Sequence, residues 1–338
     1  MLMRLRRPST LVLSALLPAT LALAACGSSD DNAQLKGFDA VSVSGAAGEA
    51  PKLDWKGQMA SGKQQEKVIH EGDGAAVAKG DRVIVNFVVG DGWTKKTVID
   101  SYGPDAGGFV TEVGAKAQPQ QVTDLLTLPI TDEIKAGMKL GTRLAVTVDS
   151  KDVIGQYLGD ASVSSYMSQH DIGNEDGLVI VADLVSVVPA APDGKPTNVS
   201  PAWAPKVVEK KGAPTALDFS GVAKPDPKGK LEVATLLQGT GAPVEAGDVI
   251  AANYLGQLYD AKKPFDESYS RGTPLSAVIS EDFGTVVKGW SKALEGVKVG
   301  SRVLIKIPPK LGYGDQAQGK DIPANSTLYF VVDVLAAG

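Results

Sequence analysis

Cysteine is almost absent from this sequence of 338 residues, in which Cys26 is the only one. A single cysteine excludes any disulfide within the chain, so the fold has to be stable without covalent cross-links. Histidine is nearly as scarce, since the sequence contains only His70 and His170. Neither has a nearby pattern of carboxylates or cysteines at metal-ligand spacing, so we expect two surface histidines and no metal site.

The lack of catalytic groups, of a phosphate-binding loop and of a basic run limits the reactions and partners that can be expected. The region from residue 214 onward contains no histidine and no phosphate-binding Gly-Lys-Ser/Thr loop. Hydrolysis by a nucleophile and base pair, or phosphoryl transfer, is therefore not expected of this region. The 34 basic and 39 acidic residues are well mixed, and no basic run stands out. Nucleic acid is accordingly excluded as an expected partner.

The first 25 residues have the layout of a secretory signal peptide. Three arginines precede an apolar stretch that ends in small residues, and Pro18 interrupts that stretch. A membrane-spanning helix would need about 20 uninterrupted apolar residues. The sequence Leu23-Ala24-Ala25-Cys26 resembles the lipobox of bacterial lipoproteins, in which cleavage leaves a lipid-modified cysteine first. A buried free thiol is the alternative for Cys26.

We therefore expect the mature protein to begin at Cys26 and to be anchored by lipid to the extracytoplasmic side of the cell membrane. Residues 26–36, which are mostly polar, would be the tether. Loss of the three arginines of the signal changes the formal net charge from −5 to −8.

Valine-rich alternation predicts strands, as in RVIVNFVV and TLYFVVDVL. Long amphipathic patterns are scarce, while 38 glycines and 20 prolines predict many turns. The expected class is α+β, with sheets as the main component and short helices. A mature chain of this length favours two domains.

Four sequence blocks recur in the same order, which indicates a duplicated domain. GDRVIVNFVVGD matches GDVIAANYLGQL, VIDSYG matches PFDESY, IKAGMKLGTRLAVTV matches ALEGVKVGSRVLIKI, and GLVIVADLV matches TLYFVVDVL. These matches place Phe87 opposite Tyr254 and Asp100 opposite Asp266. We predict domains at 37–189 and 214–338, joined by a linker at 190–213 that is semi-rigid because it is rich in proline.

The region from residue 254 to residue 330 carries apolar side chains that follow no single period. They are Tyr254, Phe265, Val286, Val287, Trp290, Tyr313, Ile322 and Phe330. One interpretation is the ordinary core of a small sheet domain. The other is an apolar cup with a few polar groups at its rim, which is typical of a site for a small ligand.

The motifs between these residues favour the second interpretation. FDESYSRG, VVKGW, ALEGVKVGSR, GYGD and IPANSTLYF resemble, in order and nearly in spacing, the FKBP-type peptidyl-prolyl isomerases, over residues 231–335. The resemblance implies two domains of this type, each a twisted antiparallel sheet wrapped over one short helix. It also implies site residues in the second copy. Catalytic roles would fall to Tyr254, Asp266 and Tyr313, and substrate-binding roles to Phe265, Arg271, Val286, Val287, Trp290, Ile322 and Phe330.

In this interpretation Trp290 is the floor of the pocket and Tyr313 donates its hydroxyl to the substrate carbonyl. Arg271 and Tyr254 hold Asp266 near the pocket, and Ile322 offers its backbone N–H to the peptide. For Asp266 and Arg271 the alternative is a plain surface ion pair, which contributes about 0–1 kcal/mol.

Prolyl isomerisation suits a chain without the usual catalytic groups. Rotation about the peptide bond has a barrier of about 18–20 kcal/mol. At the twisted transition state the amide loses resonance and becomes less polar, so a dry aromatic pocket binds it better than the planar ground state. No covalent step and no cofactor are required. The expected ligands are proline-containing polypeptides and macrolide inhibitors. Leu275 stands where an aromatic is common in the family, and the loop around Gln318 lacks the histidine often found there. These departures would either weaken macrolide binding or narrow the peptide preference, without abolishing turnover.

The first copy has lost most of the cup. Phe87 replaces a tyrosine, Ile99 and Ile180 replace phenylalanines, no tryptophan lies near Thr131, and Pro129 stands where the short helix is expected. Residues 152–173 replace the GYG turn with a longer flap. We expect this copy to fold with little or no activity and to keep an apolar groove under the flap, suited to holding peptides.

The sequence thus predicts a lipid-anchored prolyl isomerase that assists the folding of exported proteins. A non-catalytic chaperone or adaptor that holds clients is the alternative. A solute-binding lipoprotein fits the anchor but not the repeat of small sheets.

Overall fold

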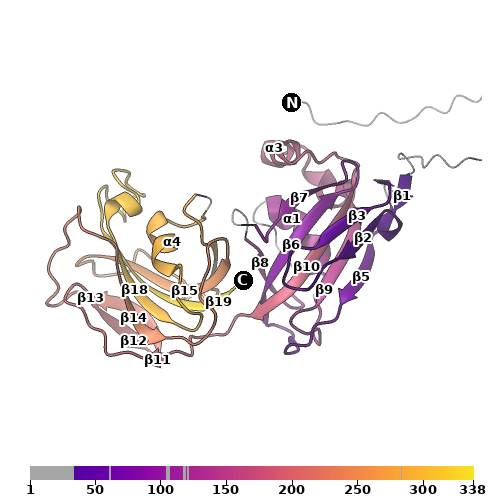
Figure 1. Cartoon of the computed structure of the whole chain (residues 1–338). Helices are drawn as coiled ribbons and strands as arrows, with labels where there is room; N and C mark the ends of the chain where they lie inside the picture. The colour runs from indigo at the N-terminus through magenta and orange to yellow at the C-terminus, as the bar shows by residue number, and fades with distance from the viewer. Residues whose placement is uncertain (1–33, 61, 104–106, 117–118, 120–121, 283) are drawn as a thin grey trace, which may run out of the picture.

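The computed structural model describes residues 34–338 apart from 61, 104–106, 117–118, 120–121 and 283. The predicted signal peptide, Cys26 and most of the tether at 26–36 lie outside the described residues. Within the described part of the chain, no helix has the length and apolar character needed to cross a membrane. The described residues form two large sheets that lie side by side, together with three two-stranded sheets (Figure 1). We call residues 34–188 the first unit and residues 195–338 the second unit.

The sheet of the first unit is antiparallel throughout. Its order is β5-β9-β10-β6-β7, with β8 also paired to β6. The strands are β5 (Gln65–His70), β6 (Arg82–Asp91), β7 (Lys96–Asp100), β8 (Phe109–Glu112), β9 (Arg143–Asp149) and β10 (Gly177–Val187).

The sheet of the second unit repeats this arrangement and adds one edge strand, β11. Its order is β11-β14-β18-β19-β15-β16, with β17 paired to β15. The strands are β11 (Lys195–Pro196), β14 (Glu232–Gln238), β15 (Val249–Leu258), β16 (Asp266–Glu267), β17 (Leu275–Val278), β18 (Arg302–Ile307) and β19 (Leu328–Ala337). Gly137 and Gly296 occupy the same turn in the two units with φ of +92° and +80°. The mixture of sheets and short helices confirms the predicted α+β class.

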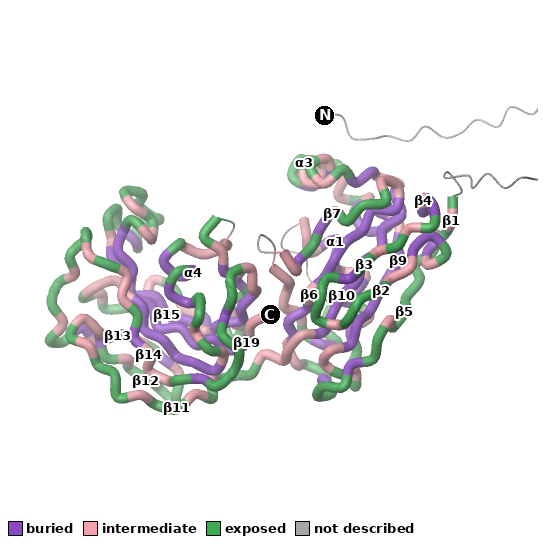
Figure 2. Tube along the Cα trace, in the orientation of Figure 1, coloured by how far each residue is buried: buried purple, intermediate pink, exposed green. Residues whose placement is uncertain are grey.

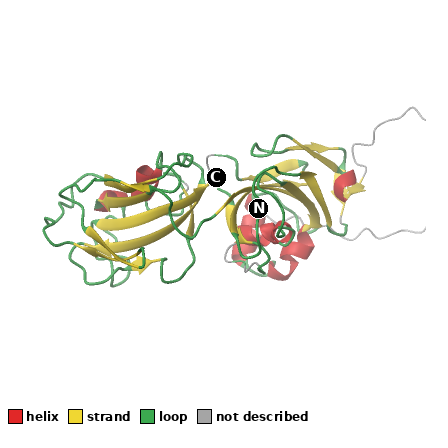
Figure 3. Ribbon diagram, turned by 90° about the horizontal axis from the view of Figure 1, so that it is seen from below, coloured by secondary structure: helices red, strands yellow, loops and turns green. Residues whose placement is uncertain are grey.

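One face of each sheet, the helix face, packs against helices (Figure 3). In the second unit α4 (Lys288–Leu294) buries Trp290 and Leu294 against this face. In the first unit α1 (Val122–Thr131) lies on the corresponding face and contains Pro129. Proline in a helix removes only the hydrogen bond of its own missing N–H and adds a local clash. Because Pro129 lies in the last turn of α1, it does not prevent the helix.

The predicted flap of the first unit does not cover an open groove. Residues 150–169 form α2 (Ser150–Ile154), a 3₁₀ turn η2 (Gly155–Tyr157) and α3 (Ala161–Gln169). Ile154 and Met167 are fully buried in the same core cluster as Phe87 and Ile180. The sequence predicted an apolar groove under the flap, whereas the structure packs apolar side chains of the flap into the core of the first unit.

A two-stranded hairpin packs on the opposite face of each sheet, which we call the hairpin face. In the first unit it consists of β2 (Val41–Ser44) and β3 (Lys52–Trp55), next to the 3₁₀ turn η1 (Gly37–Asp39) and the parallel pair β1 (Gln34–Lys36) and β4 (Gln58–Ala60). In the second unit it consists of β12 (Lys206–Lys210) and β13 (Ala213–Asp218). Burial is concentrated on the sheets between these layers (Figure 2).

The predicted linker at 190–213 therefore differs from the observed structure. It contributes β11, which pairs with β14, and β12, which pairs with β13. A boundary at residue 214 divides the hairpin, so most of the expected spacer belongs to the second unit. Sequence alone did not indicate this because the four prolines between residues 190 and 213 outweighed the short KVVEK strand pattern.

Each hairpin is tied to its sheet by a buried arginine. Arg143 donates to both carboxylate oxygens of Asp183 at 2.7 Å, and their side chains are 0% and 2% exposed. Arg143 also donates to the carbonyl of Gly45 in the β2–β3 turn at 3.1 Å. In the second unit Arg302 donates to Asp333 at 2.5 and 2.8 Å and also binds Glu209 of β12. Pairing and extra hydrogen bonds are what such buried charges require.

The two units contact each other through a small apolar seam. Ile84 of β6, Val249 and Ala251 of β15 and Ala336 of β19 are buried together there. Arg82 extends the contact by donating to the carbonyl of Gly272 at 2.9 Å. The C-terminus lies between the units in both orientations (Figures 1 and 3).

Candidate functional site

Four aromatic rings meet on the helix face of the second unit. Trp290 comes from α4, Tyr254 from β15, Phe330 from β19 and Phe265 from the residue before β16. The Trp290 ring centroid lies 5.5 Å from that of Tyr254 and 5.3 Å from that of Phe330, and Phe265 lies 5.6 Å from Phe330. All three contacts are edge-to-face, the arrangement that the quadrupoles of aromatic rings favour. We call this group of four rings the aromatic cup.

Gly256 makes the cup possible, although the sequence analysis did not identify it. In β15 it pairs with Phe330 of β19 and with Asp266 of β16. A Cβ at Gly256 would lie 2.5 Å from the Phe265 ring and 2.6 Å from the Phe330 ring. The signal was present in the sequence, because an isolated glycine inside a strand pattern often marks a close approach.

Three polar side chains form a linked group at the edge of the cup. The hydroxyl of Tyr254 donates to Oδ2 of Asp266. Arg271 donates from Nη1 to Oδ1 of Asp266 at 2.8 Å and from Nη2 to the Tyr254 hydroxyl at 3.1 Å. The structure thus brings together the three residues that the sequence assigned to this position. The Asp266 and Arg271 side chains remain 46% and 52% exposed, so their mutual attraction is screened by water.

Ser268 fixes the loop that carries this group. Its Oγ accepts from the backbone N–H of Tyr254 at 2.9 Å and donates to Oδ1 of Asn253 at 3.1 Å. Its own backbone N–H donates to the carbonyl of Tyr254 at 2.9 Å. Asp266 is therefore held close to Tyr254 by the backbone as well as by its carboxylate.

The environment moves the ionisation of both acidic groups away from neutral pH. Burial, followed by the hydrogen bond to Asp266, raises the pKa of Tyr254 to about 12. Burial opposes ionisation of Asp266, but hydrogen bonds from Tyr254 and Arg271 outweigh it and lower the pKa of this carboxyl below its ordinary value. Near pH 7 the group consists of a neutral phenol, a carboxylate and a guanidinium.

The predicted apolar wall residues also lie at the cup. Val286 and Val287 are half-buried against the aromatic core, and Val287 is the extended residue that precedes α4. Ile322 is buried in the same cluster. Its backbone N–H, which we expected to be available to a peptide, donates to the carbonyl of Gln318 at 3.3 Å. A peptide would have to replace that long bond.

Tyr313 lies in the turn after the 3₁₀ turn η3 (Pro309–Leu311), and its side chain is 37% exposed. Gly314 holds this turn with φ of +59°, a conformation that favours glycine. Its N–H donates to the carbonyl of Pro309 at 2.8 Å, and its carbonyl accepts from Asn325 at 2.7 Å. The ring of Tyr313 is therefore presented from a fixed backbone.

The strand pairing of the first unit corrects one of the residue matches between the two copies of the repeat. Ser101 makes the same two hydrogen bonds to Phe87 that Ser268 makes to Tyr254. Within β7, Ile99 pairs with Val89 and Asp100 with Val88, just as Asp266 pairs with Gly256 and Glu267 with Leu255. Ile99 thus replaces Asp266, and Asp100 corresponds to Glu267. The match of Asp100 with Asp266 was wrong by one residue because the sequence blocks alone do not fix the register.

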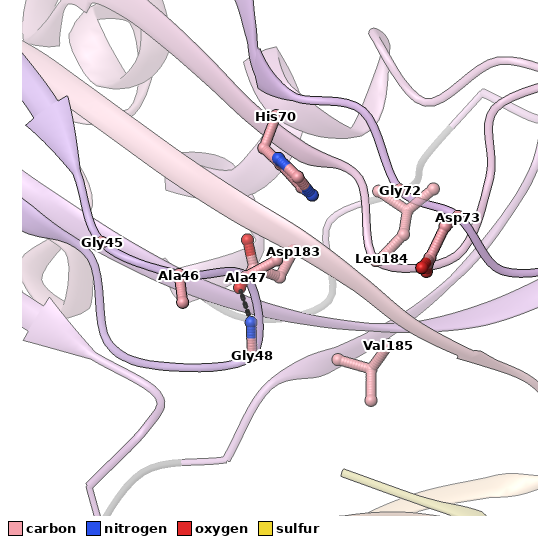
Figure 4. A pocket seen from close by; sticks show the side chains of 11 residues that line it. Gly45, Ala46, Ala47, Gly48, His70, Gly72, Asp73, Asp183, Leu184 and Val185 are labelled. Atoms are coloured by element: carbon pink, nitrogen blue, oxygen red, sulfur yellow. Dashed lines mark hydrogen bonds between the residues drawn. The ribbon is translucent and has the colours of Figure 1, made fainter.

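The first unit contains a different cavity, of about 490 Å³, on its hairpin side (Figure 4). It is lined by the β2–β3 turn, His70, Asp73 and Asp183. Asp183 already accepts hydrogen bonds from Arg143 and from the N–H of Gly48 at 2.7 Å. Its carboxylate is thus committed to holding the turn, and the cavity is a weaker candidate than the cup.

The two histidines lie in different surroundings. Nδ1 of His170 lies 2.9 Å from the carbonyl of Val98, and its ring packs on Tyr166 at 4.3 Å. His70 is exposed. Among the residues that the structure describes, no three His, Cys, Asp or Glu side chains are grouped so that they could hold a metal ion.

Comparisons with known proteins relate about a third of this chain to one family. Residues 241–335 match the family model for FKBP-type peptidyl-prolyl cis-trans isomerase. An FK506-binding protein of Streptomyces anulatus is 36% identical over 121 residues, which are 36% of this chain and 94% of that protein. FK506-binding protein 1A of Neurospora crassa is 42% identical over 106 residues, 31% of this chain and 85% of that protein. The crystal structure of FkpA from Escherichia coli is 38% identical, covering 32% of this chain and 47% of that chain with a TM-score of 0.29.

Proposed function

Since the chain belongs to the family of FKBP-type peptidyl-prolyl cis-trans isomerases and has rotamase activity, we propose that its isomerase site is the aromatic cup of the second unit. We also propose that the enzyme assists the folding of exported proteins while it is held by a lipid on Cys26 at the outer face of the bacterial membrane. The observation that carries the site assignment is the group Tyr254–Asp266–Arg271 beside the buried rings of Trp290 and Phe330.

The proposed mechanism is differential binding of the twisted amide. The proline ring of the substrate packs on Trp290 and lies among Tyr254, Phe265 and Phe330. As the amide twists, its nitrogen becomes pyramidal and its carbonyl loses resonance, so the transition state is less polar than the planar ground state. A dry apolar cup stabilises that state relative to the ground state, which lowers the barrier. The slow uncatalysed exchange, which takes tens to hundreds of seconds, leaves ample room for such acceleration.

The polar residues orient the amide in this proposal. The hydroxyl of Tyr313 donates to a substrate carbonyl at the open side of the cup. Asp266 carries a fixed negative charge next to the twisting bond, and Arg271 and Tyr254 keep it in place. No group in the cup has to gain or lose a proton, and no covalent intermediate forms.

Macrolides such as FK506 are proposed competitors for the same cup, given the FK506-binding proteins among the relatives. Leu275 is half-buried against the hydrophobic core cluster that includes three rings of the cup. A leucine offers less flat contact area than an aromatic ring, so we expect weaker macrolide binding than in relatives with an aromatic residue there.

A holding role for the first unit in place of its lost cup has no support, because the flap fills that space. The test of the proposed function is a protease-coupled assay with a short proline peptide, followed by refolding of an exported protein whose slow step is prolyl isomerisation. Acceleration of both, inhibited by FK506, would support the proposal. Turnover of the short peptide without any effect on refolding would exclude the folding role.

A further inference from the structure

Two adjoining cavities lie between the units, next to the aromatic cup. Each has a volume of about 630 Å³, and both are lined by Phe109 and Val110 of β8 and by Ser276 of β17. One wall therefore comes from the first unit and the other from the second. We call the combined space the inter-unit groove.

The groove is continuous with the cup. Arg271 lines it and also donates to Asp266 and Tyr254. Leu275 lines it and also packs against the hydrophobic core cluster that includes Tyr254, Trp290 and Phe330 of the cup. Thr285 lines it and directly precedes Val286 of the cup wall. A chain that leaves the cup on this side enters the groove.

The walls of the groove are fixed relative to each other. Ile84, Val249, Ala251 and Ala336 are buried together below it, and Arg82 of the first unit donates to the carbonyl of Gly272 in the second. Phe109 is held from behind by an edge-to-face contact with Phe87 at 5.5 Å. A groove whose walls are already in contact has a smaller ordering cost on binding than one that has to be assembled.

Two strands along the groove are suited to an extended peptide. In the described part of the chain, β8 pairs only with β6 and β17 only with β15. Each strand therefore has an edge that sheet pairing does not use. Such edges can bind an extended chain through main-chain hydrogen bonds, while side pockets bind its side chains.

We propose that the inter-unit groove binds the residues that flank the target proline in an unfolded client, in extended conformation and with apolar side chains towards Phe109, Val110 and Leu275. This inference rests on the proposed role of the cup. It assigns the first unit a part in substrate binding that depends on β8, the strand facing the second unit (Figure 1), and not on its own lost cup.

The test compares two peptides on the full chain. A four-residue proline peptide occupies the cup alone, whereas a peptide of twelve residues with one central proline and apolar flanks reaches the groove. Two variants narrow the groove from opposite walls, namely Ser276→Tyr on β17 and Thr111→Tyr on β8, which line it. Thr240→Tyr, at an exposed position outside the groove, is the matched control.

We expect KM for the long peptide to be about tenfold lower than for the short one, since a modest additional apolar burial has that effect on affinity. Both blocking variants should remove the difference and leave kcat/KM for the short peptide unchanged, while Thr240→Tyr behaves as the unmodified chain. Equal KM values for the two peptides on the unmodified chain would overturn the proposal. The proposal would also be overturned if only Ser276→Tyr removed the difference in KM between the two peptides. A change of oligomeric state in either variant would overturn it as well, because the groove would then be a contact between copies of the chain.

Failure of the cup is distinguishable from failure of the groove. If the short peptide is not turned over, the proposed site is wrong. Binding of the long peptide, measured by fluorescence anisotropy, then still reports on the groove. If Ser276→Tyr and Thr111→Tyr leave that binding unchanged, the result counts against the groove alone.

Discussion

Phe87 occupies in the first unit the position that Tyr254 occupies in the second. Each lies in the long central strand of its sheet, and each exchanges backbone and side-chain hydrogen bonds with a serine, Ser101 or Ser268. The difference between them is one hydroxyl, which in the second unit donates to Asp266. In the first unit Ile99 stands where Asp266 would be, so the acceptor has been lost together with the donor. The duplicated fold thus retains the polar group of the cup in one copy only.

Removing the hydroxyl of Tyr313 should slow turnover without affecting the fold. The side chain is partly exposed, and Gly314 and Asn325 fix its turn independently of the hydroxyl. For Tyr313→Phe we expect kcat/KM to fall roughly 5- to 30-fold, the equivalent of one hydrogen bond of about 1–2 kcal/mol. The control is Tyr259→Phe, since the Tyr259 hydroxyl bonds to the carbonyl of Val222 away from the cup. Unchanged activity in Tyr313→Phe would remove this residue from the site.

Activity should not depend on pH in the neutral range. The pKa of Asp266 is lowered, so its carboxylate persists until the pH falls below the ordinary value of about 3.9. The pKa of Tyr254 is raised to about 12, so its phenol remains neutral in alkaline buffer. We expect a flat profile of kcat/KM between about pH 5 and pH 9. A bell-shaped profile within that range would show that a titrating group takes part.

The lowered pKa of Asp266 also has a consequence for stability. A carboxyl with a depressed pKa in the folded state contributes stability above its unfolded pKa and loses it as the pH falls through the folded pKa. The variant Asp266→Asn should therefore be less stable than the unmodified chain at pH 7, and this difference should shrink in acid below about pH 4.

The second unit should need the residues before 214 for full stability. A fragment from Pro214 lacks β12 and leaves Arg302 without Glu209 and the side chains under the hairpin partly uncovered. We expect a fragment from Lys195 to be more stable by about 2–4 kcal/mol in urea unfolding. Glu209→Gln in the longer fragment measures how much of this stability difference comes from the ion pair between Arg302 and Glu209. Equal stability of the two fragments would show that β11 and β12 are dispensable.

The proposed membrane anchor depends on one thiol. Cys26→Ser removes the only thiol of the chain, to which the proposed lipid is attached, so the variant should appear in the soluble fraction of disrupted cells. The unmodified chain should remain with the membranes. Equal retention of both would contradict the anchor, and a matched Ser28→Ala variant controls for changes in the tether sequence.

The strands of the two large sheets and the grouping of the four aromatic rings could be predicted from sequence because each rests on local signals. Alternating valines and the motifs around Asp266 and Trp290 need no knowledge of distant contacts. The register of the repeat does depend on distant contacts. The sequence matched Asp100 to Asp266, and only the pairing of β7 with β6 shows that Ile99 occupies the position equivalent to Asp266. The burial of Met167, the pairing of β12 and the close approach at Gly256 likewise depend on tertiary contacts that no short pattern contains.

The central claim, that the cup of the second unit carries the activity, is tested most directly by kcat/KM of the full chain for a short proline peptide. The measurement compares the unmodified chain with the double variant Tyr254→Phe/Asp266→Asn and with Asp100→Asn in the first unit. The account predicts a loss of at least about tenfold in the double variant, because the polar group at the edge of the cup is then removed, and no change in Asp100→Asn. Full activity in the double variant, or an equal loss in Asp100→Asn, would contradict it.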